Sequence, residues 1–151
     1  MDLLAVQFLK TYQVWHHRRL LVSLTRQPRR ELEFIKNSLE ADGKNYHTWS
    51  YRQWLLAYFG GAGGGGITMD ADDSDFDFDI GEDLWTGELD FVDTMLAQDI
   101  RNNSAWHHRF FVVWGCGVRE GESDRERILK RELMFVVSIY FLFRALMKAV
   151  T

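Results

Sequence analysis

The sequence predicts an all-α protein, a right-handed α-α superhelix (solenoid) of helical hairpin repeats similar to tetratricopeptide repeats. Three observations predict this fold. A Trp followed three residues later by an Arg occurs three times, and such pairs lie on one face of a helix. Apolar stripes at helical spacing follow these pairs. Pro28 is the only proline, so long helices can continue without interruption. The pairs are Trp15 with Arg18, Trp49 with Arg52, and Trp106 with Arg109.

The spacing of the three Trp residues indicates a true repeat. Trp15 and Trp49 are 34 residues apart, the usual length of a two-helix unit, whereas Trp49 and Trp106 are 57 apart. Glu31 precedes Trp49 by 18 residues and Glu88 precedes Trp106 by the same 18, so the extra residues form an insertion before Glu88. We predict a single domain over residues 1–151, with repeats at about 11–41, 45–98 and 102–145 and a disordered Gly- and Asp-rich insertion at 60–83.

The first hairpin begins near Thr11, which can cap a helix that runs to about Thr25. Gln27 and Pro28 form the turn, because proline is favoured at the first position of a helix. In the helix that follows, the residues from Glu31 to Glu40 place Leu32, Ile35 and Leu39 on one apolar stripe.

The second hairpin follows the same plan. Asn45 is the predicted cap of a helix that runs through Phe59. Its partner helix carries apolar residues at the offsets found in the first hairpin, namely Leu89, Val92 and Leu96.

The insertion between these two helices contains eight acidic residues and neither Lys nor Arg. The segment starting at Asp75 does not match a calcium-binding loop, because Ile80 and Thr86 stand where such a loop needs Gly and Glu. We therefore expect a solvated, flexible loop.

The third hairpin begins at Asn103 and Ser104 and breaks at Gly115-Cys116-Gly117. The residues from Ser123 to Glu126 form a capping box that opens a last helix. Residues 133–150 are unusually apolar, but the charge-free run ends at Arg144 and is too short for a transmembrane span. We expect this helix to be buried or covered by a partner.

Composition excludes some classes of function. The net charge is -4, and without the acidic insertion the remainder carries +4, which is too weak to indicate nucleic-acid binding. Cys116 is the only cysteine, so an internal disulfide is impossible. With no visible signal peptide, these features favour a reducing, cytoplasmic location.

Two adjacent histidine pairs, His16-His17 and His107-His108, suggest a metal site at first sight. Neighbouring histidines point to different faces of a helix, and no Cys or carboxylate recurs beside them at ligand spacing. We expect this chain alone to bind no metal.

The Trp and Arg of each pair have an ordinary structural interpretation. The Trp packs against the next hairpin, and the Arg stacks over it or bonds to a neighbouring acid.

Polar residues at the starts of two helices allow two interpretations. Lys10, Tyr12 and Gln13 precede Trp15, and Lys44, Asn45, Tyr46 and His47 stand at equivalent positions before Trp49. Helix N-termini with a nearby Lys favour anions, so these residues can form an anion site. They can equally be helix-start residues that face water.

The same residues carry a family resemblance. The stretches Lys10–Arg19, Lys44–Trp54 and Asp99–Trp106 resemble the repeats of protein prenyltransferase alpha subunits. The motifs Arg-Asn-Asn-Ser-x-Trp and Arg-Gln-Trp are more similar to those of the alpha subunit shared by farnesyltransferase and geranylgeranyltransferase type I than to those of the Rab-type subunit. Because the family's chains extend on both sides, the resemblance describes a central part.

The resemblance implies a crescent of hairpins around a beta subunit. The heterodimer would transfer farnesyl or geranylgeranyl from an isoprenoid diphosphate to the cysteine of C-terminal CaaX motifs in protein substrates. The resemblance also implies a zinc ion held by the beta subunit and a magnesium ion that assists the farnesyl reaction. For this chain it implies the following residue roles. Lys10 matches a lysine near the diphosphate, Tyr12 and Gln13 match residues that face the active site, and Asn45, Tyr46 and His47 match residues of the subunit interface. Thr11 replaces the family's usual Asn, which we expect to weaken the helix cap only slightly.

Two alternatives remain. One is a non-catalytic helical-repeat scaffold that binds a protein partner, and the other is the Rab-type geranylgeranyltransferase alpha subunit.

Overall fold

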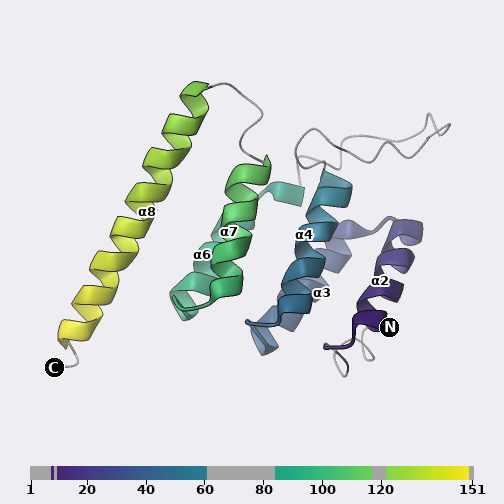
Figure 1. Ribbon diagram of the computed structural model, residues 1–151. Coiled ribbons are helices and arrows are strands. Elements are labelled where there is room, and N and C mark those ends of the chain that lie inside the picture. The colour runs from purple at the N-terminus through teal and green to yellow at the C-terminus, as the bar shows by residue number, and fades with distance from the viewer. Residues whose placement is uncertain (1–7, 9, 61–83, 117–121, 150–151) are drawn as a thin grey trace. The chain divides into compact units, whose positions relative to one another are not determined.

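The computed structural model describes residues 8, 10–60, 84–116 and 122–149, and its described residues form helices joined by short connections (Figure 1). The chain divides into two compact units, Met1–Cys116 and Gly117–Thr151. The first unit contains α2 (Tyr12–Thr25), α3 (Pro28–Ala41), α4 (Tyr46–Gly60), α6 (Glu88–Gln98) and α7 (Asn103–Cys116), and the second contains α8 (Glu122–Ala149). The predicted all-α superhelix of helical hairpins is confirmed.

The helix boundaries follow the sequence signals closely. α2 ends at Thr25, and α3 starts with Pro28 at its first position, as predicted. Gly87 precedes α6 with φ of 79°, a backbone conformation that glycine adopts without steric cost. α8 begins at Glu122, so Ser123 lies inside its first turn and not at the predicted cap position.

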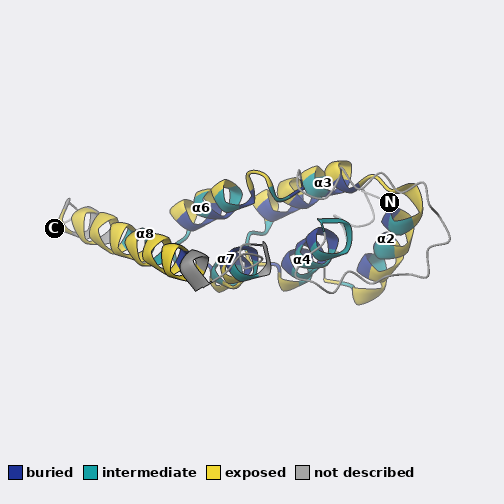
Figure 2. Ribbon diagram, turned by 90° about the horizontal axis from the view of Figure 1, so that it is seen from above, coloured by how far each residue is buried: buried dark blue, intermediate teal, exposed yellow. Residues whose placement is uncertain are grey.

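The first unit has two layers of helices. Figure 2 shows α3 and α6 in one row and α4 and α7 in the other. α3 packs on α4 and α6 packs on α7, while α4 also packs on α2 and on α7. Fully buried aliphatic side chains of these helices form part of the core, and each contributes roughly 1.5–3 kcal/mol. They are Ile35, Leu39, Leu55, Leu56, Val92 and Leu96.

The first helices of the hairpins run parallel. The rings of Trp15 and Tyr51 lie 5.0 Å apart, and one turn later the guanidinium of Arg19 lies 5.1 Å from the ring centre of Trp54. Because these contacts advance together along α2 and α4, the N-termini of the two helices lie at the same end of the unit, as Figure 1 shows.

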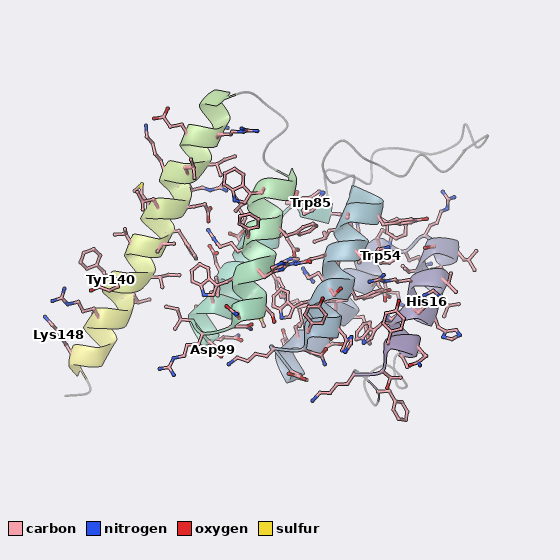
Figure 3. The ribbon with its side chains drawn as sticks, viewed as in Figure 1. His16, Trp54, Trp85, Asp99, Tyr140 and Lys148 are labelled. Atoms are coloured by element: carbon pink, nitrogen blue, oxygen red, sulfur yellow. The ribbon has the colours of Figure 1, made fainter. Side chains whose placement is uncertain are left out.

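The ends of the predicted insertion lie next to each other. The indole N–H of Trp85, which Figure 3 labels, donates a hydrogen bond of 2.9 Å to the carbonyl of Gly60. A Cβ added at Gly60 would lie 2.5 Å from that indole nitrogen, so the contact requires glycine. Residues 61–83 lie outside the described part of the chain. The expectation that they form a disordered, solvated loop therefore stays a prediction.

α8 is the helix described in the second unit. It has 28 residues, and many of its apolar side chains are exposed, including Leu133, Met134 and Phe141. Within the described residues, no helix combines the length and the apolar character that crossing a membrane requires.

Candidate functional site

The turn before α4 is built around Asn45. Its side-chain oxygen accepts hydrogen bonds from the backbone N–H groups of His47 (3.0 Å) and Thr48 (3.2 Å), while its amide nitrogen donates to Asp42 (3.4 Å). The side chain is only 5% exposed. Asn45 therefore caps α4, as predicted, and its side chain is engaged in shaping the turn.

The turn before α2 is formed differently. Thr11 occupies the cap position, but its side chain makes no capping hydrogen bond. The expectation that Thr11 caps this helix through its side chain is wrong. The physical reason is that Thr is a weaker cap than Asn, because its branched side chain is stiffer.

Three predicted site residues stand at this end of α2. Lys10, Tyr12 and Gln13 are exposed, and the ring of Tyr12 stacks on His16 at 6.4 Å. The Nδ1–H of His17 donates a hydrogen bond of 2.8 Å to the carbonyl of Gln13.

The equivalent residues of α4 lie at the same end of the unit. Tyr46 is 72% exposed, His47 is half-buried, and their rings form an edge contact at 5.9 Å. Lys44 differs from Lys10, because its ammonium forms an ion pair of 2.6 Å with Asp99 and lowers the pKa of that carboxyl. Of the two lysines, Lys10 is the one for which the described residues provide no ion pair.

The Trp side chains hold the turns to the helices. The indole of Trp49 donates to the carbonyl of Gly43 (2.8 Å), and the indole of Trp106 donates to that of Ile100 (2.8 Å). Asn102, the cap of α7, also donates to Gly43 (2.6 Å). The turns before α4 and α7 therefore touch.

A buried polar cluster joins α2, α3 and α4. Arg18 donates to both carboxylate oxygens of Glu31, and Tyr51 donates its hydroxyl to the same carboxylate at 2.7 Å. The Arg18 guanidinium also lies 3.5 Å from the ring centre of Phe34. Burial raises the pKa of Tyr51 well above its ordinary range, so this hydroxyl remains a donor.

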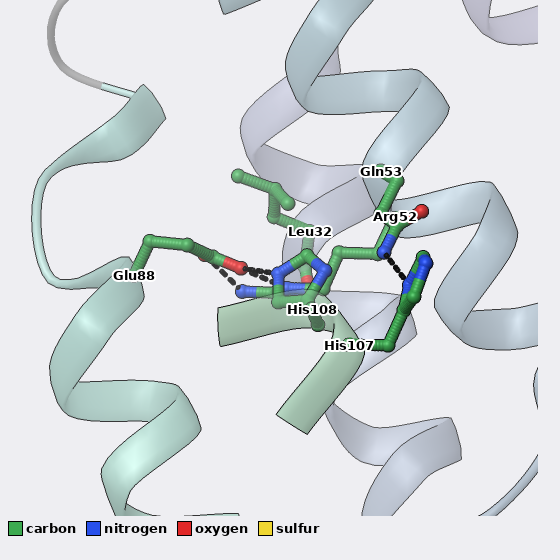
Figure 4. Close-up of polar contacts among 6 residues, drawn as sticks. All are labelled: Leu32, Arg52, Gln53, Glu88, His107 and His108. Atoms are coloured by element: carbon green, nitrogen blue, oxygen red, sulfur yellow. Dashed lines mark hydrogen bonds and ion pairs between the residues drawn. The ribbon is translucent and has the colours of Figure 1, made fainter. Parts of the chain in front are cut away.

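A second cluster repeats this chemistry one hairpin later (Figure 4). Both oxygens of Glu88 accept from Arg52 at 2.6 Å, and His108 donates from Nε2 to Glu88 at 2.6 Å. Burial opposes ionisation of Glu88, but hydrogen bonds from His108 and Arg52 outweigh it and lower its pKa to about 2. Burial lowers the pKa of His108, which favours a neutral ring.

The third pair departs from this pattern. Arg109 forms its ion pair with Asp93 on α6, and the Asp93 side chain is 40% exposed. The rings of Trp15 and Trp49 pack on the following helices, Trp15 on Tyr51 and Trp49 on His108.

Tyr51 and His108 are the residues that motif reading missed. Each stands two positions after a repeat Trp and 20 positions after the Glu that it binds. That common offset is a signal in the sequence, but it becomes meaningful only once the partner Glu is known.

The described residues contain no group of three His, Cys, Asp or Glu side chains that could hold a metal ion.

The two clusters coincide with a known repeat. Residues 28–59 and 85–115 match the protein prenyltransferase alpha subunit repeat, and these segments contain both Glu residues with their Tyr or His donors. Two segments of this chain therefore carry the repeat of protein prenyltransferase alpha subunits. The resemblance seen in the sequence is thereby confirmed.

The chain is similar to alpha subunits of both prenyltransferase types. The mouse geranylgeranyl transferase type-2 subunit alpha is 30% identical over 138 residues, which cover 87% of this chain and 20% of the mouse protein. The Dictyostelium discoideum protein farnesyltransferase/geranylgeranyltransferase type-1 subunit alpha is 62% identical over 29 residues, 19% of this chain and 9% of that protein.

A solved structure extends the likeness to three dimensions. The Candida albicans protein geranylgeranyltransferase-I complexed with GGPP matches with a TM-score of 0.60 and 29% identity, covering 91% of this chain and 41% of the matched chain. This chain thus spans a fifth of the mouse relative and less than half of the matched structure.

Proposed function

We propose that this chain acts in the alpha subunit of a heterodimeric CaaX protein prenyltransferase, together with a beta subunit. The observation that carries the proposal is the exposed Lys10 at the start of α2, at the same end of the unit as Tyr46 and His47. The likeness to a geranylgeranyltransferase-I structure and the 62% identity to a type-1 alpha subunit support the CaaX class.

In this proposal Lys10 acts on the leaving group. Its ammonium faces the isoprenoid diphosphate and stabilises the negative charge that develops as the carbon–oxygen bond breaks. Tyr12 and Gln13, one turn of α2 away from His16, position the CaaX peptide. Tyr46 and His47 line the interface with the beta subunit, and Asn45 supports them by capping α4.

The metals expected for this chemistry lie outside this chain. Zinc held by the beta subunit would favour the thiolate form of the substrate cysteine, and magnesium would neutralise charge on the diphosphate. The described residues of this chain contribute the Lys10 charge and the polar face around it.

The test is co-expression with a CaaX prenyltransferase beta subunit, followed by transfer of farnesyl and geranylgeranyl from their diphosphates to a CaaX peptide. Lys10→Ala is expected to lower kcat by about 10- to 100-fold, because one charge stabilising the leaving group is lost. Lys44→Ala is the matched control and is expected to change kcat less than about twofold, since Lys44 pairs with Asp99. Equal losses in both variants, or none in Lys10→Ala, would contradict the role of Lys10.

The Rab-type enzyme is the second candidate, and one observation favours it. The match to the mouse type-2 subunit covers 138 residues, far more than the type-1 match. A complex that ignores CaaX peptides but modifies a Rab protein presented by an escort protein would select this candidate. A stable complex with neither activity would select the scaffold alternative.

A further inference from the structure

Tyr51 is placed to link the two helices that carry the proposed site. Its ring lies 5.0 Å from that of Trp15 on α2, and its hydroxyl donates to Glu31 on α3 at 2.7 Å. The same carboxylate binds Arg18 on α2. One side chain of α4 is thereby tied to α2 directly and through a shared carboxylate.

The link is rigid because it is buried. Tyr51 is 0% exposed, Arg18 is 5% exposed and Glu31 is 8% exposed. A charged group in such surroundings is stable only when its hydrogen-bond partners hold it in good geometry. Movement of α2 against α4 would break at least one of these bonds.

The link is also close to the proposed site. Tyr51 follows Tyr46 by five residues, so it lies roughly 7.5 Å along the axis of α4 at the usual rise per residue. Arg18 follows Tyr12 by six residues, or roughly 9 Å along α2. A helix is stiff over such spans, so a shift at the cluster moves the helix N-terminus with it.

We propose that Tyr51 is a positioning residue, which sets through Glu31 the spacing between the Lys10 turn and the Tyr46–His47 turn. The inference rests on the proposed function, since it names what holds the parts of that site in register. Misplacing a reacting group by about 1 Å can reduce the rate about 100-fold.

The second cluster supplies a matched control. His108 binds Glu88 with the same chemistry and is equally buried, but its cluster joins α4, α6 and α7 and does not include α2. Tyr51→Phe and His108→Phe each remove one donor to a buried carboxylate and keep an aromatic ring. They differ in whether the lost bond ties α2 to α4.

The kinetic test uses the complex with the beta subunit. Tyr51→Phe is expected to lower kcat about 5- to 20-fold with little change in KM for the isoprenoid diphosphate, and His108→Phe less than about twofold. In a Lys10→Ala background Tyr51→Phe is expected to cause no further loss, because it acts through Lys10. Tyr51→His, which places the donor of the second cluster in the first, is expected to restore most of the activity.

Equal effects of Tyr51→Phe and His108→Phe on kcat would overturn the inference. It would also be overturned if Tyr51→Phe lowered kcat as strongly in the Lys10→Ala background as in the wild type. Should Tyr51→Phe fail to fold, as judged by its helical circular dichroism, Tyr51→His carries the test. Its kcat is then expected to lie within about threefold of the wild type, and a tenfold loss would overturn the inference.

A distance measurement separates this inference from the proposed function. Nitroxide labels on Lys10→Cys and Lys44→Cys, in a Cys116→Ser background, report the spacing of the two turns by pulsed electron paramagnetic resonance. Tyr51→Phe is expected to shift or broaden the distance distribution, and His108→Phe to leave it unchanged. An unchanged distribution in Tyr51→Phe would overturn the inference. Absence of prenyl transfer by the wild-type complex would instead overturn the proposed function alone.

Discussion

Glu31 and Glu88 are carboxylates in the interior of a small helical unit, and their partners explain why they are tolerated. Each carboxylate receives two donors from an Arg of its own hairpin and one from the next hairpin. Removing one partner of such a pair leaves an uncompensated buried charge and typically costs about 3–5 kcal/mol. Tyr51 and His108 can therefore donate to these carboxylates only when successive hairpins pack in the correct register.

The same residues predict how stability depends on pH. The folded chain lowers the pKa of His108 below 6.5, so the unfolded chain takes up a proton first and stability falls as pH drops below 6.5. The pKa of Glu88 falls from 4.5 to about 2 on folding, so its contribution of about 3 kcal/mol is present above pH 4.5 and lost as pH falls toward 2.

We therefore expect the urea unfolding free energy of the wild type to decrease between pH 7.5 and 5. His108→Phe is expected to flatten this decrease. His107→Phe, which alters the neighbouring exposed histidine, is expected to retain it. A wild-type free energy of unfolding that stays constant over this range would contradict the role assigned to the neutral His108 ring.

At the scale of elements, the helix starts differ in how well they are capped. Asn45 and Asn102 accept backbone N–H groups of α4 and α7, whereas Thr11 makes no such bond at α2. Among these three helix starts, the one without a side-chain cap lies beside the proposed Lys10 site.

Asn45→Ala is expected to lower the free energy of unfolding by about 1 kcal/mol, because two N–H groups of α4 lose their acceptor. Thr11→Ala is the control and is expected to change it by less than about 0.5 kcal/mol. Thermal or urea unfolding of the three proteins measures both effects. A loss in Thr11→Ala as large as that in Asn45→Ala would contradict the assigned difference.

Local signals predicted the elements well. The apolar stripe of Ile35 and Leu39, the position of Pro28 and the cap at Asn45 depend on neighbours within a few residues, and each is found as predicted. The Glu31–Tyr51 and Glu88–His108 bonds join different hairpins and could not be predicted, since a lone Tyr or His gives no local sign of its partner. The cap at Thr11 failed because residue type alone does not determine side-chain geometry.

At the scale of the whole molecule, the repeat accommodates an insertion without losing its register. The equal offsets of Glu31 and Glu88 from the next Trp are kept on either side of it. The Trp85–Gly60 hydrogen bond explains this, because it closes the point where the chain leaves and returns.

Replacing residues 61–83 by a linker of about eight Gly and Ser residues is expected to raise the free energy of unfolding by about 1 kcal/mol or less, because closing a shorter loop costs less entropy. Gly60→Ala in the same background is expected to reverse the gain, since its Cβ would collide with Trp85. Urea unfolding measures both changes. A substantial loss of stability on shortening would contradict the interpretation of this segment as a solvated loop.

The hydrogen bond between Trp85 and Gly60 also makes this point of the hairpin a suitable insertion site for other sequences. We expect a polypeptide whose two ends meet at this spacing to be tolerated there while the helices on both sides keep their alignment. A fluorescent domain or an affinity handle placed between these residues would report on assembly from within the chain, with both termini left untouched.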